Sequence, residues 1–232
     1  MNKYIAALPA IRPPFLTLAP LSCLVGLAYC AYQGITIDMF DALLSVLGAI
    51  LAAIAVNTIN EYQDFQSGLD LNTTPTPFSG GSGALPANPG HASAVLISAI
   101  ISLVMTIVIG VYFVLQNIWL LPIGILGVIL VVFYTRWINK SPWLCLFSPG
   151  IAFGLIMILG SELALTNKVT LMCAILSTIP FFLVNNLLLL NQYPDIKPDN
   201  PIGRNHFPLA YGIDNRTQIY ALFNMLTACV ID

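Results

Sequence analysis

Acidic side chains gather in two short stretches of this sequence, each directly after a long apolar run. Residues 60–70 read NEYQDFQSGLD and residues 191–199 read NQYPDIKPD, and together they hold five of the ten acidic residues in the chain. The apolar run before each stretch is long enough for a helix, so both stretches are predicted to follow helix ends. We interpret them as the two halves of one site.

The spacing within the stretches is typical of residues that share a helix face. Asn60 and Asp64 are four residues apart, which places them on one face if the preceding helix continues. Asn191, Asp195 and Asp199 repeat that spacing. Two prolines interrupt the second set, so it is predicted to lie on a kinked or unwinding helix end.

The residue types in these stretches favour a hard cation. Oxygen ligands without histidine or cysteine beside them favour Mg²⁺, or Mn²⁺, over zinc. Mg²⁺ commonly joins a few carboxylates to substrate phosphates, and basic side chains suit the remaining phosphate oxygens. The candidate bases are Arg136, Lys140, Lys197 and Arg204. The pattern therefore indicates a metal-bound diphosphate, and acidic loops that are merely solvated are the alternative that it leaves open.

The composition is that of a membrane protein. The chain has 232 residues, of which 58% are hydrophobic and 8% charged, and its mean hydropathy is +0.86. Soluble domains carry about 25% charged residues. The net charge of −2 provides no basic surface for nucleic acid. The five cysteines stand singly in apolar runs, which is typical of small buried hydrophobic residues.

About seven apolar segments are candidates for transmembrane helices, because about 20 apolar residues cross a bilayer. We expect an all-α polytopic bundle forming a single domain over residues 1–232, with long polar connections at about 60–91 and 191–217. The candidate spans are 14–34, 39–59, 92–115, 118–137, 142–163, 169–190 and 218 onward. The last has only about 15 residues, so we expect a C-terminus truncated from a longer protein.

The basic residues predict the orientation. With alternating spans, seven of the eight fall on one side of the membrane and only Lys168 falls on the other. This bias predicts a cytoplasmic N-terminus and places both acidic stretches on the cytoplasmic side. The turn-rich residues 72–91 lack the Gly-Lys-Ser/Thr ending of a P-loop. They are either a plain connection or a flap over the site.

The two stretches resemble the two aspartate-rich motifs of the UbiA-type intramembrane prenyltransferases. Residues 60–70 are similar to the form N-D-Y-x-D-x-x-x-G-x-D, which is typical of the 1,4-dihydroxy-2-naphthoate prenyltransferase branch, and residues 191–203 resemble N-x-x-x-D-x-x-x-D-x-x-x-G. The opening Arg12-Pro13-Pro14 and the Tyr134-Thr135 pair also resemble family positions. The similarity extends over essentially the whole chain.

This resemblance implies a bundle of nine transmembrane helices around a lipid-accessible cavity. It also implies a Mg²⁺-dependent transfer of a polyprenyl group from an allylic diphosphate to an aromatic acceptor in menaquinone or ubiquinone biosynthesis, at a prokaryotic inner or plasma membrane. Dihydroxynaphthoate is favoured over hydroxybenzoate as the acceptor. The implied metal ligands are Asn60, Glu61, Asp64, Asp70, Asp195 and Asp199; the implied catalytic residues are Asp64, Asp195 and Tyr134; the implied substrate-binding residues are Asn60, Asn191, Lys140, Arg136, Lys197 and Arg204.

The sequence departs from the family pattern at several places. Glu61 stands where the family usually has Asp, and residues 71–91 lack the basic residue that often follows the first motif. The stretch after the second motif reads Arg204-Asn205-His206 instead of Lys-Arg-Thr. These differences leave open which base binds the diphosphate. His206 is interpreted as a solvated loop residue, and Glu162 as a solvated helix end.

Two other classes of protein use clustered acids at a membrane. A CDP-alcohol phosphotransferase is an alternative enzyme, but its D-G-x-x-A-R opening is absent here. A divalent-cation transporter is a non-enzymatic alternative, and it would be expected to carry acids in broken helices at the bilayer midplane. The acids of this chain are instead predicted at span ends beside arginine and lysine.

Overall fold

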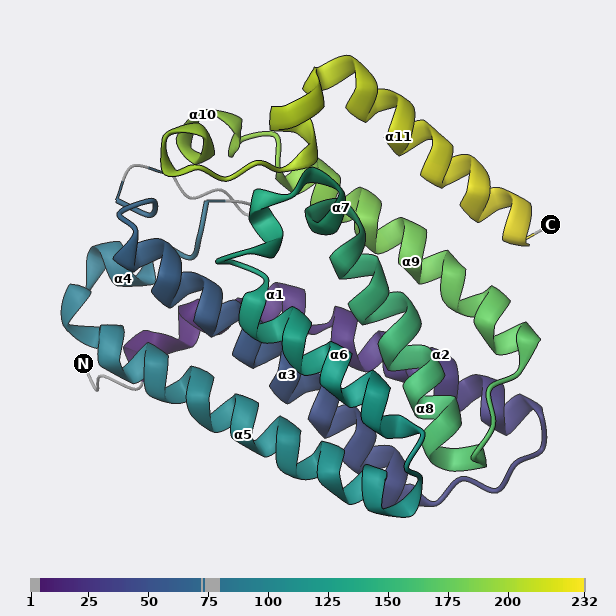
Figure 1. Cartoon of the computed structure of the whole chain (residues 1–232). Coiled ribbons are helices and arrows are strands. Elements are labelled where there is room, and N and C mark those ends of the chain that lie inside the picture. Colours follow the sequence, from purple (N-terminus) through teal and green to yellow (C-terminus); the bar gives the residue numbers. More distant parts are fainter. Residues whose placement is uncertain (1–4, 72, 74–79, 232) are drawn as a thin grey trace.

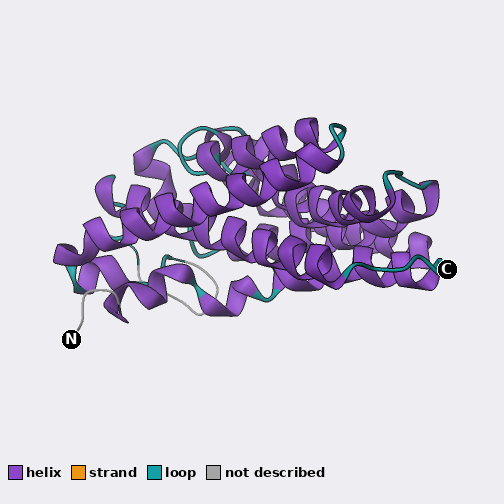
Figure 2. Cartoon of the chain, turned by 90° about the horizontal axis from the view of Figure 1, so that it is seen from below, coloured by secondary structure: helices purple, strands orange, loops and turns teal. Residues whose placement is uncertain are grey.

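The protein is built from helices, as predicted. The computed structural model describes residues 5–71, 73 and 80–231, and within these ranges there is no strand (Figure 2). The elements shown in Figure 1 are η1 (Ile5–Ile11), α1 (Pro13–Leu16), α2 (Leu18–Tyr32), α3 (Met39–Gln66), α4 (Ala84–Ala87), η2 (Pro89–His91), α5 (Ala92–Gln116), α6 (Leu120–Phe133), η3 (Ile138–Lys140), α7 (Pro142–Gly150), η4 (Ile151–Ile156), α8 (Met157–Thr166), α9 (Leu171–Asn191), α10 (Ile196–Asp199), η5 (Asn200–Ile202) and α11 (Phe207–Ile231).

Five helical segments of the described chain are long and apolar enough to cross a membrane. They are Leu8–Tyr32, Met39–Gln66, Pro89–Gln116, Pro142–Thr166 and Leu171–Asn191. Each contains most of one predicted span. The segment expected at 118–137 is a shorter apolar helix, α6, because the chain leaves the helix at Tyr134 and turns before η3. The helix expected from residue 218 already begins at Phe207 and is kinked at Gly212, whose φ is 80°.

Glycines allow several helices to approach closely. A Cβ atom on Gly26 of α2 would lie 2.7 Å from the carbonyl oxygen of Ile158 in α8. On α3, Gly48 faces Ile109 of α5, where a Cβ atom would lie 3.1 Å from a side-chain methyl group. Small residues of this kind let helix backbones pack in a membrane, where lipid provides no hydrophobic drive for association.

The helix between Pro142 and Thr166 contains the π-helical segment η4, which begins directly after the close approach of Gly150 to α9. A Cβ atom at Gly150 would lie 2.4 Å from the carbonyl oxygen of Phe181, so only glycine fits there. Gly150 N donates to Asn185 Oδ1 (2.6 Å) on α9, and Pro149 has no N–H to donate. Such local losses of regular bonding are where π-helical turns form.

Helix α3 positions the first acidic stretch. It is capped at its start by the Asp38 carboxylate, which accepts from the backbone N–H groups of Phe40 and Asp41. The helix then continues without a break to Gln66. The polar connection expected from residue 60 is therefore helical over its first residues, and Asn60 and Asp64 lie one turn apart on a single rigid helix.

Glu162 is not the solvated helix end expected from the sequence, because it is only 1% exposed. Its carboxylate accepts from the backbone N–H and the hydroxyl group of Thr170, the N-cap residue of α9. The Thr170 hydroxyl also hydrogen-bonds to Tyr29 Oη (2.9 Å) on α2. This network therefore joins α2, α8 and α9 at the end of the bundle opposite the acidic stretches.

Candidate active site

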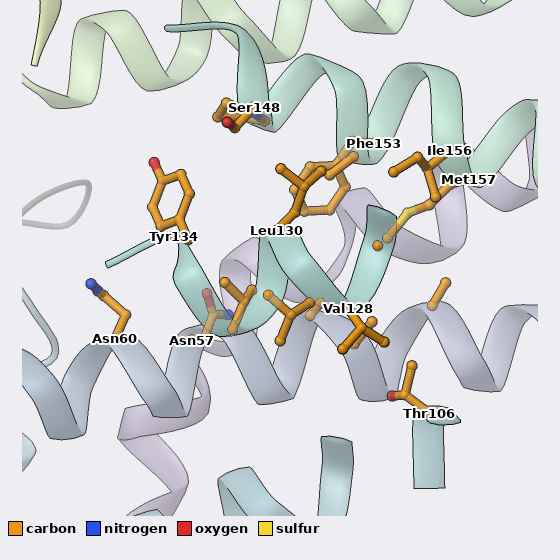
Figure 3. Close-up of a pocket in the computed structure, with 18 of the residues that line it drawn as sticks. Asn57, Asn60, Thr106, Val128, Leu130, Tyr134, Ser148, Phe153, Ile156 and Met157 are labelled. Carbon is orange, nitrogen blue, oxygen red and sulfur yellow. The ribbon is translucent and has the colours of Figure 1, made fainter. Parts of the chain in front are cut away.

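A single large cavity connects the two acidic stretches to the apolar interior of the bundle. Its volume is about 730 Å³. Figure 3 shows its walls: Asn57 and Asn60 project from α3, Leu130 and Tyr134 from the end of α6, and Phe153 from the α7–α8 segment. One end is polar and charged, while the rest is lined mainly by aliphatic and aromatic side chains. The cavity is therefore amphipathic along its length.

Most of the candidate site residues line this cavity. Those that do are Asn60, Asp64, Asp70, Tyr134, Asn191, Asp195, Asp199 and Arg204. They come from the end of α3, the end of α6 and the stretch between α9 and α11. The two halves of the predicted site are thus brought together in space, although more than a hundred residues separate them in the sequence.

The first half is fixed by hydrogen bonds at the end of α3. Asn60 Nδ2 donates to Asp64 Oδ2 (3.0 Å), one turn further along the helix, and to Thr135 Oγ1 (3.1 Å) at the end of α6. The expected pairing of Asn60 with Asp64 on one face is therefore present. Since Thr135 is buried, this contact also ties the end of α6 to the acidic end of the cavity.

Arg204 joins the two halves. Its guanidinium forms ion pairs with Asp64 on α3 and with Asp199 Oδ1 (3.3 Å) in α10. Burial alone would lower the pKa of Arg204, but the Asp64 and Asp199 carboxylates together raise it above its ordinary value. Arg204 therefore stays charged in a largely buried position, where its guanidinium can serve carboxylates or phosphate oxygens.

His206 supports the same ion pairs. It is 2% exposed, in contrast to the solvated loop residue expected from the sequence. Its Nδ1 accepts from the backbone N–H of Leu209 (3.4 Å), which leaves Nε2 to face Asp199 Oδ2 at 3.4 Å. His206 therefore faces the second oxygen of the Asp199 carboxylate, while Arg204 pairs with the first.

Two further carboxyl groups carry raised pKa values. Burial, followed by the charges of Asp64 and Glu61, raises the pKa of Asp70 to about 7. Burial, followed by the charge of Asp199, raises the pKa of Asp195 to about 6. Charge repulsion among closely placed carboxylates is relieved by a cation. The acidic end of the cavity is therefore suited to binding one.

Glu61 has a different environment from the other acids. It is fully buried and does not line the cavity. Its carboxylate pairs with Arg12 Nη2 (3.3 Å) and accepts from the backbone N–H (3.0 Å) and the hydroxyl group of Ser82. Glu61 thus joins α3 to the N-terminal segment and to the chain before α4, and the structure does not place it with the candidate metal ligands.

Arg12 is a cavity residue that sequence reasoning did not assign to the site. It lines the cavity and has the left-handed backbone (φ 54°) that is rare for a residue other than glycine. Such a conformation costs about 1 kcal/mol, and the ion pair with buried Glu61 holds it in place. A charged residue directly before two prolines is the signal in the sequence that could have directed attention to it.

Three of the candidate bases lie away from the cavity. Arg136, Lys140 and Lys197 are exposed, and none of them lines it. Lys197 instead borders a separate hollow beside Leu69. Arg204 and Arg12 are therefore the basic residues that the structure places at the cavity within the described ranges.

The side-chain oxygen atoms at the acidic end of the cavity are candidate ligands for a magnesium ion. No three His, Cys, Asp or Glu side chains converge closely enough to hold a metal in the described part of the chain. Mg²⁺, however, is usually bound by one or two carboxylates together with substrate phosphates. Asp70 Oδ2 and Asp195 Oδ1 are buried and have no hydrogen-bond partner among the described residues. The site therefore fits Mg²⁺ shared with a diphosphate better than a cage made of protein ligands alone.

The fold and the cavity define a class: helical membrane proteins with an intramembrane cavity that is acidic at one end. The sequence model of the UbiA prenyltransferase family matches residues 19–231. The chain therefore belongs to the UbiA prenyltransferase family, and the resemblance of the two motifs is confirmed.

One relative supports the predicted branch. The chain is 29% identical over 205 residues to 1,4-dihydroxy-2-naphthoate octaprenyltransferase of Bacillus subtilis strain 168. The alignment covers 87% of this chain and 64% of that protein. The chain thus spans somewhat less than two thirds of the length of this relative.

Solved structures support the fold. A UbiA homolog from Archaeoglobus fulgidus bound to DMAPP and Mg²⁺ superimposes with a TM-score of 0.72 at 17% identity, over 97% of this chain and 75% of that chain. A digeranylgeranylglyceryl phosphate synthase gives a TM-score of 0.70 at 19% identity, over 99% and 76%. The predicted all-helical, UbiA-like bundle is therefore confirmed.

Proposed function

We propose that this chain transfers a polyprenyl group from an allylic polyprenyl diphosphate to an aromatic acceptor in lipoquinone biosynthesis. The observation that carries the proposal is the single cavity whose charged end contains both acidic stretches and whose remainder is apolar. A polyprenyl diphosphate has the same division into a charged head and a long apolar tail. The Bacillus relative favours a dihydroxynaphthoate-like acceptor over a hydroxybenzoate-like one.

In the proposed reaction, the bond between the allylic carbon and the diphosphate oxygen breaks and its electron pair leaves with diphosphate. The π electrons of the acceptor ring form the new carbon–carbon bond. The ring carbon that was attacked then loses a proton to water, or its carboxylate as CO₂, which restores the aromatic ring. The barrier falls when charge on the leaving group is stabilised and water is kept from the allylic cation.

Different residues of the cavity would bind the diphosphate, hold the metal ion and face the allylic cation. Arg204 and Arg12 carry the positive charge that can face the leaving diphosphate. Asn60, Asp64, Asp70, Asp195 and Asp199 would hold Mg²⁺, with Asn191 beside them. When bound, Mg²⁺ would neutralise charge that develops on the diphosphate, and Mn²⁺ has the same ligand preference. The Tyr134 ring, which lies at the end of α6 in the cavity wall, would face the allylic cation.

The membrane placement follows from the same proposal. The five long apolar helices are suited to a multi-pass membrane protein. We propose that the N-terminus and both acidic stretches face the cytoplasm of a prokaryotic cell, since most basic residues fall on that side. The diphosphate would then bind from the cytoplasmic surface while its tail enters the cavity.

A transfer assay tests the proposed function. Detergent-solubilised protein would be given a radiolabelled polyprenyl diphosphate with dihydroxynaphthoate or hydroxybenzoate, with Mg²⁺, with Mn²⁺ and with a chelator. We expect product that requires a divalent ion and forms faster with dihydroxynaphthoate. Equal rates with chelator would overturn the metal assignment, and product from neither acceptor would overturn the aromatic acceptor class.

A substitution at Gly81, which lies beside Asp70, tests the role of that carboxylate. A Cβ atom on Gly81 (φ +75°) would lie 2.8 Å from Asp70 Oδ1, so Gly81→Ala is expected to displace that carboxylate and to lower the transfer rate about tenfold to a hundredfold. Gly34→Ala is the matched control, because Gly34 has φ +73° and its Cβ atom would meet nothing within 4 Å. The left-handed backbone that the two positions share should cost each variant about 1 kcal/mol of stability. Equal activity of the two variants would refute the role of Asp70.

A further inference from the structure

A small polar cluster interrupts the apolar wall of the cavity next to its charged end. Gln192 Nε2 donates to Cys145 Sγ (3.2 Å), and Cys145 Sγ donates to Asn139 Oδ1 (3.3 Å). Tyr134 also interacts with Cys145. All four residues line the cavity, and Gln192, Cys145 and Asn139 are each more than nine-tenths buried.

One atom of this cluster has no partner. Gln192 Oε1 is buried and accepts no hydrogen bond from any described residue. A buried acceptor left unpaired is destabilising, because it has lost its hydrogen bond to water. The other end of the Gln192 amide is fixed, because Cys145 accepts from its N–H group and itself donates to Asn139. Gln192 is therefore a residue of the cavity lining whose buried carbonyl oxygen has no partner among the described residues.

The position of this oxygen limits the group that could bind it. Gln192 directly follows Asn191 and precedes Asp195 by three residues, so it lies beside the charged end of the cavity. Asn205 N donates to Asn139 O (2.9 Å), which anchors the cluster to the loop that carries Arg204. A ligand at Gln192 would therefore lie beside the diphosphate end, where an acceptor ring has to meet the allylic carbon.

We propose that Gln192 Oε1 accepts a hydrogen bond from the hydroxyl group of the acceptor, and that Cys145 and Asn139 are positioning residues for it. This inference rests on the proposed function and specifies the substrate class as phenols and naphthols with a hydroxyl group next to the attacked carbon. As the new carbon–carbon bond forms, positive charge spreads to that hydroxyl oxygen, so its O–H becomes a stronger donor. The bond to Gln192 therefore strengthens in the transition state.

The test compares an acceptor with its methyl ether, which lacks the donor. The protein is the full chain in detergent with geranyl diphosphate and Mg²⁺. In Gln192→Met, kcat/KM for the hydroxylated naphthoate should fall about tenfold to a hundredfold, while the rate with the methyl ether should stay within about twofold. Gln192→Asn withdraws the carbonyl group by one methylene and should show the same loss of preference for the hydroxyl group.

The matched control is Gln63→Met. Gln63 also has an unpartnered side-chain oxygen, but it does not line the cavity. It should keep the wild-type preference for the hydroxylated acceptor. Affinity for geranyl diphosphate, measured by equilibrium binding, should be unchanged in all three variants, which separates this subsite from the diphosphate site and from misfolding.

The outcomes separate the two proposals. If the wild type transfers the prenyl group and Gln192→Met keeps the preference for the hydroxylated acceptor, the subsite is refuted and the proposed function stands. Equilibrium binding of the naphthoate and its ether, without diphosphate, provides the second measurement. If the wild type binds the naphthoate more tightly than its ether and Gln192→Met does not, the subsite is supported even if no transfer occurs. If the wild type binds the naphthoate and its ether equally well, the subsite is overturned.

Discussion

Asp64→Asn is expected to lower kcat/KM for prenyl transfer by about a thousandfold, because the change removes a charge from the centre of the site. Asp64 accepts from Asn60, pairs with Arg204 and lines the charged end of the cavity. Asparagine has nearly the same shape but cannot neutralise a cation. Radiolabelled transfer at saturating Mg²⁺ measures the loss, and a titration with Mg²⁺ should show weakened metal dependence.

Asp41→Asn is the matched control for this prediction. Asp41 lies in the first turn of the same helix, α3, and accepts from Tyr112 Oη (2.7 Å), a bond that asparagine can keep. The same change of charge should therefore leave transfer nearly intact when it is made at a residue that does not line the cavity and lies at the other end of α3 from the acidic stretch. If Asp64→Asn retained about a tenth of wild-type activity or more, Asp64 could not be a principal metal ligand.

Arg204→Gln is expected to destabilise the protein by about 3–5 kcal/mol and to weaken prenyl diphosphate binding. The reason is that both of its partners, Asp64 and Asp199, are less than a tenth exposed, and a buried carboxylate that loses its partner carries an uncompensated charge. Thermal unfolding in detergent measures the first effect, and equilibrium binding of geranyl diphosphate with Mg²⁺ measures the second.

Lys197→Gln provides the comparison, because it removes a positive charge from the same connection at an exposed position outside the cavity. It should change stability by less than about 0.5 kcal/mol and leave binding unaltered. A similar loss of stability in both variants would mean that net charge, rather than the ion pairs of Arg204, holds the two acidic stretches together.

The sequence predicted the helices best where their boundaries depend on local chemistry. Asp38 caps α3 and Thr170 caps α9, and both helices begin within about two residues of the predicted spans. Boundaries that depend on tertiary contacts were predicted less well. The segment expected at 118–137 ends as a helix at Phe133, and Thr135 beyond it is held by Asn60 of α3.

The roles of the basic residues likewise depend on tertiary contacts and were not predicted from the sequence. Composition and position could not separate Arg204 from Lys197, because both lie in the same polar connection. The structure separates them, since only Arg204 meets carboxylates from both acidic stretches. His206 and Glu162 were expected to be solvated because polar residues at a helix end or in a loop usually are, but both are buried, His206 facing Asp199 and Glu162 accepting from Thr170.

What the sequence determined by itself is the class of protein and the two motifs. Apolar runs of bilayer length specify helices because a backbone in lipid must satisfy its own hydrogen bonds. The spacing of Asn60 and Asp64 follows from the helix repeat, which also turns the neighbouring Glu61 about 100° away from Asn60. The tertiary structure alone decided that Glu61 pairs with Arg12, that Arg204 joins the two halves, and that Gln192 lines the cavity with an unpaired oxygen. These contacts join residues far apart in the chain, so no local pattern encodes them.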